Sequence, residues 1–355
     1  PVKSNELVAG AAELGVLLLL FEVGLESTVA QMLEVGASSF LVASVGVIAP
    51  FALGWLASGW WHPHASTYVH VFLGATLTAT SVGITARVLK DLDRSQTAEA
   101  RVILGAAVID DVMGLVILAV VIGALGAADR GGTLSYGTVA VTLLKALAFL
   151  VGSLVLGLRT APRVFSLAAK LRAPGVLLVV GLAICFSLAW LASQLGLAPI
   201  VGAFAAGLIL ERVHYKDFTE RGERGLEELV RPISGLLTPI FFVLMGMRTQ
   251  LASFAQPGVL GLAAVLTVAA ILGKQACGLG VLGRGVDRLT VGIGMIPRGE
   301  VGLIFANLGS ALTLGGAAVV DHATYSAIVA MVIVTTLITP PALEWAFARK
   351  RTQPT

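Results

Sequence analysis

Two adjacent aspartates, Asp110 and Asp111, are the residues best suited to chemistry in this sequence, because they lie inside an apolar stretch, 102–127. Consecutive residues of a helix point about 100° apart, so the two carboxylates are expected to have different partners. One can bind a cation or protons while the other pairs with a buried base. The alternative interpretation is a polar patch between packed helices, for which two buried charges would be costly.

Lys274 is the basic residue best placed to pair with one of these aspartates. It lies ten residues before Arg284, which is about 15 Å along a helix and close to the middle of a membrane. A lysine at this depth extends its ammonium group to the membrane surface only with difficulty. Because a buried ammonium group needs a carboxylate, we expect Lys274 to form an ion pair with one of the aspartates.

Four more polar residues lie where two apolar stretches lose helical character. Arg298 and Glu300 flank Gly299 just after Pro297, and they could neutralise the ends of interrupted helices or pair with each other. Thr80 and Ser81 could offer hydroxyl or freed carbonyl oxygens to a small hard cation. Arg298 and Glu300 could have either this structural role or a direct role in transport, and simple helix packing is the alternative for Thr80 and Ser81.

The composition defines the elements that must position these residues. Of the 355 residues, 57% are hydrophobic and only 13% are charged, against about 25% charged in soluble domains. This excludes a soluble globular enzyme and predicts an all-α polytopic membrane protein. Eleven apolar stretches are expected to span, namely 7–26, 37–60, 68–86, 102–127, 136–158, 175–195, 197–211, 229–247, 258–283, 289–311 and 323–347.

The basic residues predict the orientation of these stretches. Eighteen of the 24 Lys and Arg residues fall on one face of the predicted topology, and only Lys3, Arg130 and Arg248 fall on the other. The rich face is therefore expected to be cytoplasmic, with the C-terminus on it. This bias accounts for the net charge of +3 without a nucleic-acid partner. Lys145, which has no obvious partner, remains at membrane depth together with Lys274 and Arg298.

Two of the stretches are predicted to be broken helices. Residues 76–85 contain four threonines, a serine and a glycine, and residues 292–302 contain Pro297 among glycines. The first lies in the middle of the second to fourth stretches, and the second lies in the middle of the ninth to eleventh. Because the two sets are seven stretches apart, an odd number, one set is inverted in the membrane relative to the other. Paired interrupted segments in inverted halves indicate a secondary transporter with its site near the midplane.

Other motifs indicate neither a cofactor nor an enzyme. Gly278, Gly280 and Gly283 match GxGxxG, but no strand precedes them, so close helix packing is the better interpretation. Cys185 and Cys277 lie in apolar stretches and form no metal-binding pair. We predict a transporter without a cofactor.

Six segments carry a resemblance to a known family: 13–26, 79–89, 105–112, 196–204, 271–274 and 297–303. Together they are highly specific, and the resemblance covers nearly the whole chain. They resemble the monovalent cation:proton antiporter-2 family, in particular its NapA-like sodium/proton antiporters. The resemblance implies an NhaA/NapA-like antiporter fold with inverted repeats and two broken, crossing helices.

The resemblance also implies roles for individual residues. Asp111 would be the carboxylate that binds the transported sodium and the proton, and Asp110 would pair with Lys274. Thr80, Ser81, Arg298 and Glu300 would support the crossing of the broken helices.

A homodimer in the membrane lipid is a further implication. Residues 1–36 and 159–250 would form a dimerisation scaffold, 37–127 and 258–347 the core ion-transport domain, and 136–158 a linker helix. The family has thirteen helices, and this sequence begins where the third is expected. The first two, which contribute to the dimer interface, are thus expected to be absent, or dimerisation to differ.

The functional hypothesis is an electrogenic antiporter of the bacterial inner membrane that exchanges sodium or lithium for protons by alternating access and serves pH homeostasis. A Kef-like potassium/proton exchanger is the alternative. An intramembrane aspartyl protease is less favoured, because its two aspartates must converge from separate helices. A passive channel is disfavoured by the inverted broken helices.

Overall fold

The computed structural model describes residues 6–26, 36–129, 136–171, 173, 175–210, 218, 222, 224–248, 256–283, 285–314 and 316–352. Several basic residues used for the orientation lie outside this part of the chain: Lys3, Arg130, Arg172, Arg212, Lys216, Arg221 and Arg284. The chain divides into two compact units. Unit 1 comprises Pro1–Ala30, Ile122–Ala127 and Thr133–Arg248, and unit 2 comprises Gln31–Val121, Ala128–Gly132 and Thr249–Thr355.

The described residues are almost entirely helical, and eight of their helices are long and apolar enough to cross a membrane. These are α1 (Glu6–Glu26), α3 (Ala37–Trp61), α6 (Ala98–Asp129), α7 (Tyr136–Ala169), α8 (Val176–Gln194), α11 (Leu226–Arg248), α12 (Pro257–Gln275) and α15 (His322–Thr352). The other three predicted stretches correspond to the short α9 (Pro199–Ile209) and to two interrupted helices. The predicted all-α polytopic class is confirmed.

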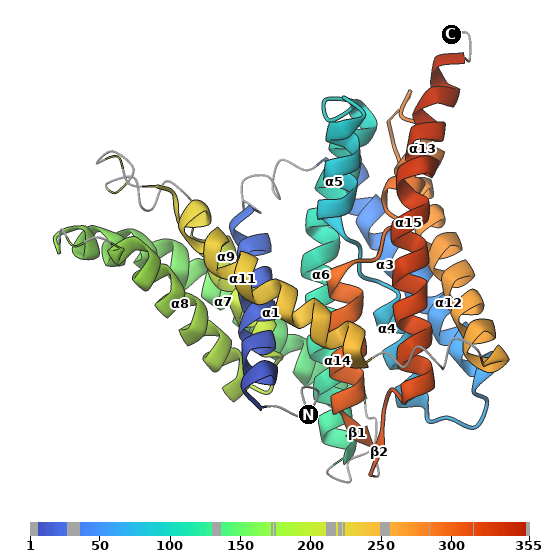
Figure 1. Ribbon diagram of the computed structural model, residues 1–355, viewed down its shortest axis with the longest axis horizontal. Coiled ribbons are helices and arrows are strands. Elements are labelled where there is room, and N and C mark those ends of the chain that lie inside the picture. Colours follow the sequence, from blue (N-terminus) through green and yellow to red (C-terminus); the bar gives the residue numbers. More distant parts are fainter. Residues whose placement is uncertain are drawn as a thin grey trace. The chain divides into compact units, whose positions relative to one another are not determined.

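Unit 1 is built around α1, which packs against α9 and α11, while α8 packs on α9 (Figure 1). Glycines allow the backbones to meet. A Cβ on Gly24 would overlap the carbonyl oxygen of Phe204, and one on Gly207 would overlap that of Phe21. Close contact of this kind, rather than polar bonding, holds membrane helices together where small residues face each other.

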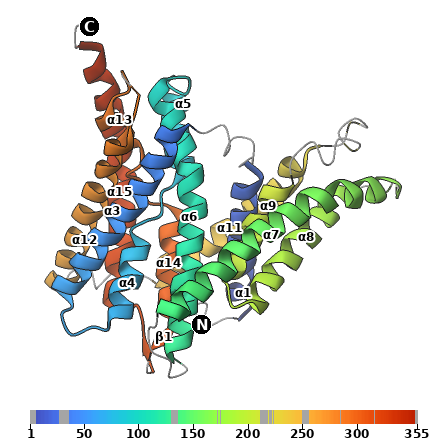
Figure 2. The same cartoon turned by 180° about the vertical axis from the view of Figure 1, so that it is seen from behind.

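Helix α7 differs from the prediction, which ended it at 158 and placed a loop with Arg159 and Arg163 after it. It continues to Ala169 (Figure 2). Ala161, Phe165 and Ala168 recur at helical spacing and are buried in the core of unit 1. The arginines are exposed on the same helix. The prediction was wrong because the arginines were interpreted as a loop, whereas the apolar periodicity continues past them.

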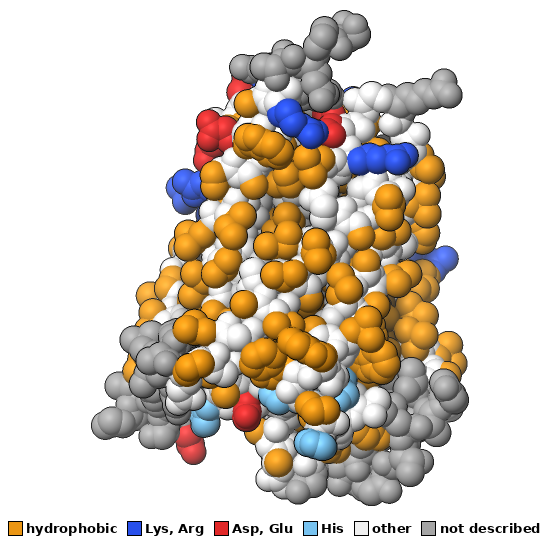
Figure 3. All heavy atoms as spheres, turned by 90° about the vertical axis from the view of Figure 1, so that its right-hand side faces the viewer, with side chains coloured by type: hydrophobic (Ala, Val, Ile, Leu, Met, Phe, Trp, Pro, Cys, Tyr) orange, Lys and Arg blue, Asp and Glu red, His pale blue; other side chains and the backbone are white. Residues whose placement is uncertain are grey.

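Unit 2 contains α3, most of α6, α12 and α15 together with both interrupted helices. Helix α3 packs against α12 and the 3-10 turn η4 (Ala276–Gly280), and α12 packs against α15. A short hairpin of β1 (Thr313–Leu314) and β2 (Ala317–Ala318) precedes α15. On the face in Figure 3, hydrophobic side chains dominate the middle, most Lys and Arg lie near one end with Asp and Glu, and His lies near the other end with further acidic side chains. An apolar belt between polar ends suits a surface in contact with lipid.

The interruptions fall where the sequence predicts them. Helix α4 (Thr67–Thr76) and helix α5 (Val82–Asp91) are separated by an unwound segment, 77–81. Helix α13 (Arg288–Gly294) and helix α14 (Glu300–Ala311) are separated by 295–299. Both unwound segments are buried almost throughout, so their freed backbone groups must be satisfied by protein.

Candidate functional site

The two unwound segments bind each other directly inside unit 2. The backbone N–H of Ser81 donates to the carbonyl oxygen of Pro297 at 2.9 Å. Four residues further on, the Thr85 hydroxyl donates to the carbonyl oxygen of Gly294 at 2.7 Å. These bonds satisfy carbonyls that the interruption of α13 leaves without a helical partner. The broken helices therefore form one connected crossing.

Arg298 lies at this crossing and is fully buried. Its Nη1 donates to the carbonyl oxygen of Thr78 at 3.3 Å and also to that of Ala79. The guanidinium charge thus lies at the C-terminal end of half-helix α4, where freed carbonyls carry partial negative charge. The Arg298 carbonyl oxygen accepts from the Thr336 hydroxyl of α15 at 2.6 Å, which links the crossing to a third element.

Glu300 and the two hydroxyl residues of the first broken helix complete the crossing. The Ser81 hydroxyl donates to Oε2 of Glu300 at 3.0 Å. Glu300 is the first residue of α14, a position at which a carboxylate is stabilised by the helix dipole. The Thr80 hydroxyl lies 3.5 Å from the carbonyl oxygen of Met295, a contact at the limit of hydrogen bonding. Within the described chain, Glu300 bonds to Ser81 and forms no ion pair with Arg298.

Asp110 and Lys274 form an ion pair in the interior of unit 2. Lys274 Nζ lies 2.8 Å from Oδ1 of Asp110, and the two side chains are 0% and 1% exposed. Gly46 of α3 lies against the pair, since a Cβ there would make an ordinary contact of 3.6 Å with Lys274 Nζ. Removing one partner of such a pair leaves an uncompensated buried charge, which costs about 3–5 kcal/mol.

Asp111, the next residue of α6, has different surroundings. It is half-buried, whereas Asp110 is sealed. Within the described part of the chain no side chain forms a hydrogen bond with Asp111, and the nearby charges that act on it are Asp110, Glu300 and Lys274. Asp110 is thus paired with Lys274, whereas the carboxylate of Asp111 is available to bind another cation.

The structure brings all seven site residues predicted from the sequence into unit 2: Thr80, Ser81, Asp110, Asp111, Lys274, Arg298 and Glu300. Lys145 belongs to unit 1 and is exposed on α7. The prediction missed Gly46, Thr85 and Thr336. Thr85 falls in the threonine-rich stretch and could have been included, but Gly46 and Thr336 resemble many other small helix residues, so only the fold identifies them.

Comparisons with known proteins agree with this geometry. The sequence profile of the family described as "Sodium/hydrogen exchanger, transmembrane" matches residues 2–349. The chain is 40% identical over 359 residues to the high-affinity Na⁺/H⁺ antiporter NhaS3 of Synechocystis sp., covering 99% of this chain and 74% of that protein. It is 34% identical to the Na⁺/H⁺-K⁺ antiporter GerN of Bacillus cereus, covering 98% of this chain and 86% of GerN.

A solved structure shares the fold. The sodium proton antiporter MjNhaP1 from Methanocaldococcus jannaschii aligns with a TM-score of 0.64 at 19% identity, over 96% of this chain and 84% of that chain. The expected antiporter fold and the expected sodium/proton antiporter family are confirmed, although the family that matches is broader than the antiporter-2 group named from the sequence. This chain is an integral membrane protein and belongs to the sodium/hydrogen exchanger family.

Proposed function

We propose that the chain exchanges sodium for protons by alternating access, with Asp111 binding the two ions in turn. The observation that carries this proposal is the contrast between neighbouring carboxylates beside the crossing. Asp110 is neutralised by Lys274 at 2.8 Å, whereas Asp111 is half-buried and its carboxylate forms no hydrogen bond with a side chain of the described residues. A carboxylate that takes sodium and a proton alternately must be accessible and must not be held by a permanent cation.

The Asp110–Lys274 pair gives the exchange its charge balance. A single carboxylate that alternates between one sodium ion and one proton moves no net charge, so electrogenic exchange needs a second proton. In this proposal Lys274, the partner of Asp110, carries that proton, and the aspartate pair with a lysine resembles the pattern of electrogenic antiporters. The membrane potential then contributes about 2.3 kcal/mol per charge per 100 mV to sodium extrusion. If Lys274→Ala exchanged ions with an unaltered response to an imposed potential, a charge-carrying lysine would be excluded.

The crossing supplies the surroundings in which a sodium ion can lose its water. Ser81 and Glu300 bind one another across the two broken helices, and Arg298 holds the carbonyls of 78 and 79. In this proposal Thr80, Ser81, Arg298 and Glu300 support the crossing, because oxygen atoms and helix ends fixed by such bonds need no reorganisation when the ion arrives.

The test is proton flux in proteoliposomes that contain purified protein and a pH-sensitive dye. A sodium gradient should drive proton movement in the wild type, and Asp111→Asn should remove it. Asp91→Asn is the matched control, because Asp91 is exposed and, among the described residues, its ion-pair partner is the exposed Arg87 at 3.9 Å. Sodium-driven flux that is unchanged in Asp111→Asn would refute the assignment of the ion site.

Potassium is a second candidate ion, since GerN is named as a Na⁺/H⁺-K⁺ antiporter. Flux measured with sodium, lithium and potassium gradients in turn distinguishes the two functions. We expect sodium and lithium to drive protons at lower concentrations than potassium. A preference for potassium would favour the potassium/proton exchanger.

The geometry disfavours the other two classes considered from the sequence. A protease would need both aspartates to share one water molecule, but Asp110 is bound to Lys274 and is sealed, while its neighbour Asp111 is not. A passive channel would need an open path, whereas the unwound segments are buried and bonded to each other. Saturation of the flux at low turnover would exclude the channel directly.

The assembly and orientation are also proposals. Unit 2, which holds every residue of the crossing, would be the moving core, and unit 1 would form the scaffold of a homodimer surrounded by lipid. The basic-residue bias supports a C-terminus on the cytoplasmic side of the bacterial inner membrane. Labelling of a cysteine introduced at the C-terminus in intact and opened cells tests the orientation, and cross-linking in membranes tests the dimer.

A further inference from the structure

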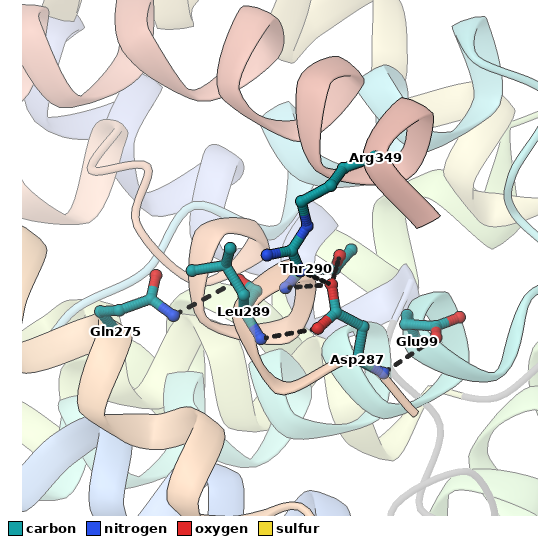
Figure 4. A network of polar contacts seen from close by, with 6 residues as sticks. All are labelled: Glu99, Gln275, Asp287, Leu289, Thr290 and Arg349. Atoms are coloured by element: carbon teal, nitrogen blue, oxygen red, sulfur yellow. Dashed lines mark hydrogen bonds and ion pairs between the residues drawn. The ribbon is translucent and has the colours of Figure 1, made fainter. Parts of the chain in front are cut away.

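A second polar network lies at the other end of α13, away from the crossing. Its centre is the carboxylate of Asp287, which immediately precedes α13 (Figure 4). The carboxylate accepts from the backbone N–H groups of Leu289 and Thr290, each at 3.3 Å, and from the Thr290 hydroxyl at 2.6 Å. Asp287 therefore caps the first turn of α13, the arrangement that stabilises a helix start.

The same carboxylate is bound by a cation from another helix. Arg349 Nη2, near the end of α15, donates to Oδ2 of Asp287 at 2.9 Å. The Arg349 guanidinium also lies over the ring of Trp345, 5.6 Å from its centre, which orients the guanidinium group. Arg288, the residue after Asp287, points instead to the carbonyl oxygen of Val281 at 3.4 Å. Of these two neighbouring cations, Arg349 is therefore the one that binds the Asp287 carboxylate.

The network also reaches the helix that carries the aspartate pair. The backbone N–H of Asp287 donates to Oε1 of Glu99 at 3.0 Å, and Glu99 is 2% exposed. Glu99 lies near the start of α6, eleven residues before Asp110, which is about 16 Å along the helix. One residue thus connects the start of α13 with α6 and α15.

Helix α13 itself transmits position from one end to the other. It has only seven residues, about 10 Å of helix, and a helix this short has little stability of its own. At its far end Gly294 and Met295 accept the hydroxyl groups of Thr85 and Thr80 at the crossing. In the middle, Gln275 Nε2 lies 3.4 Å from the carbonyl oxygen of Leu289. A shift at Asp287 must therefore move the crossing or break these bonds.

From these contacts we propose that Asp287 and Arg349 are positioning residues for ion exchange: their ion pair sets the placement of α13 relative to α15 and α6, and hence the geometry of the crossing beside Asp111. The inference rests on the proposed function. Asp287 stays ionised at working pH, because its pKa lies below that of a free aspartate: burial raises it, but hydrogen bonds from Thr290, Arg349 and Leu289 outweigh this effect.

The chain offers variants that separate the pair from the cap. Asp287→Asn removes the charge and keeps one side-chain oxygen for the cap, but it loses the second oxygen that accepts in the first turn of α13. Arg349→Gln removes the cation and affects no cap, and Arg349→Lys restores a positive charge. The matched control is Arg94→Gln. Arg94 also contacts α15, since its guanidinium lies 5.8 Å from the centre of the Phe347 ring, but it does not bind Asp287.

The measurement is the sodium dependence of proton flux in proteoliposomes, resolved into apparent KM and maximal rate per folded protein. Asp287→Asn and Arg349→Gln should each raise the KM for sodium by about fivefold at most, the size expected for a partly exposed ion pair. The double variant should be no worse than either single variant, because both remove the same contact. Arg349→Lys should recover part of the loss, and Arg94→Gln should retain the KM of the wild type.

Several results would overturn the inference. An unchanged KM in Asp287→Asn and Arg349→Gln, or an equal change in Arg94→Gln, would show that the pair does not position the site. A fall in folded protein and maximal rate at constant KM would mean a purely structural role. If Asp287→Asn does not fold, the test is the KM for sodium of Arg349→Gln against that of Arg349→Lys. Equal KM values in these two variants would then overturn the inference. Absence of sodium-driven flux in the wild type would instead refute the proposed function.

Discussion

The glycine-packed helices of unit 1 and the crossing of unit 2 satisfy their buried backbone polar groups in different ways. In unit 1, α1 meets α9 at Gly24 and Gly207 with every backbone group still inside a helix. In unit 2, the backbone leaves the helix at 77–81 and 295–299. Its polar groups there are bound by the backbone N–H of Ser81, the Thr85 hydroxyl and the Arg298 guanidinium. Close packing of continuous helices gives a rigid structure but leaves no free polar groups. An interrupted helix has free backbone polar groups, beside which an ion-binding site can form.

The largest expected effect comes from leaving one buried charge unpaired at the crossing. Lys274→Met removes the cation beside Asp110 and should lower the free energy of unfolding by about 3–5 kcal/mol. Asp110→Asn in the same protein should recover much of that loss, because both charges are then absent. Thermal unfolding of the single and double variants in detergent measures this. A double variant as unstable as Lys274→Met would contradict the account.

A comparable change in unit 1 should allow no such rescue. Gly207→Val places a branched side chain against the backbone of Phe21 and should destabilise the protein by about 1–3 kcal/mol or more, because backbone atoms cannot move aside. The KM for sodium of the folded fraction should stay at its wild-type value. Gly114→Ala is the matched control, because no atom lies within 4 Å of a Cβ at that position.

A single bond of the crossing should have a smaller effect. Thr85→Val keeps the shape of the side chain but removes the donor to Gly294, which costs about 1 kcal/mol or somewhat more if the carbonyl stays unsatisfied. We expect a modest loss of stability together with a higher KM for sodium. Thr267→Val is the control, since Thr267 donates within its own helix to Ala263 at 2.6 Å. Equal effects of the two variants on the KM for sodium would show that the Thr85–Gly294 bond has no particular role in ion binding.

The smallest effect concerns the pH dependence of the Asp287 network. Because the pKa of Asp287 is depressed in the folded protein, its charge contributes stability above the pKa of an unfolded aspartate, and this contribution disappears as the pH falls through the folded pKa. The difference in Tm between wild type and Asp287→Asn should thus be constant from about pH 6 to 9 and should shrink only below about pH 4. A difference that grows in acid would have the wrong sign.

Much of unit 2 could be predicted from the sequence because it contains residue types that membrane helices usually lack. Pro297 among glycines, a run of threonines and a lysine at mid-membrane depth are rare in apolar helices, so each indicates a special role. The end of α7 was missed because Arg159 and Arg163 outweighed the buried positions that follow. The Asp287–Arg349 bond joins residues 62 positions apart, and only the fold places Gly46 beside Lys274. Contacts of this kind depend on the fold and leave no local pattern.

The most direct test of the account is sodium binding by Asp111. Binding of radioactive sodium to purified protein should disappear in Asp111→Asn, while the double variant Asp110→Asn/Lys274→Met, which removes the sealed pair and keeps Asp111, should still bind. Thermal unfolding of each variant confirms that the protein is folded. Sodium binding by Asp111→Asn at the level of the wild type would contradict the central claim that the half-buried carboxylate holds the transported ion.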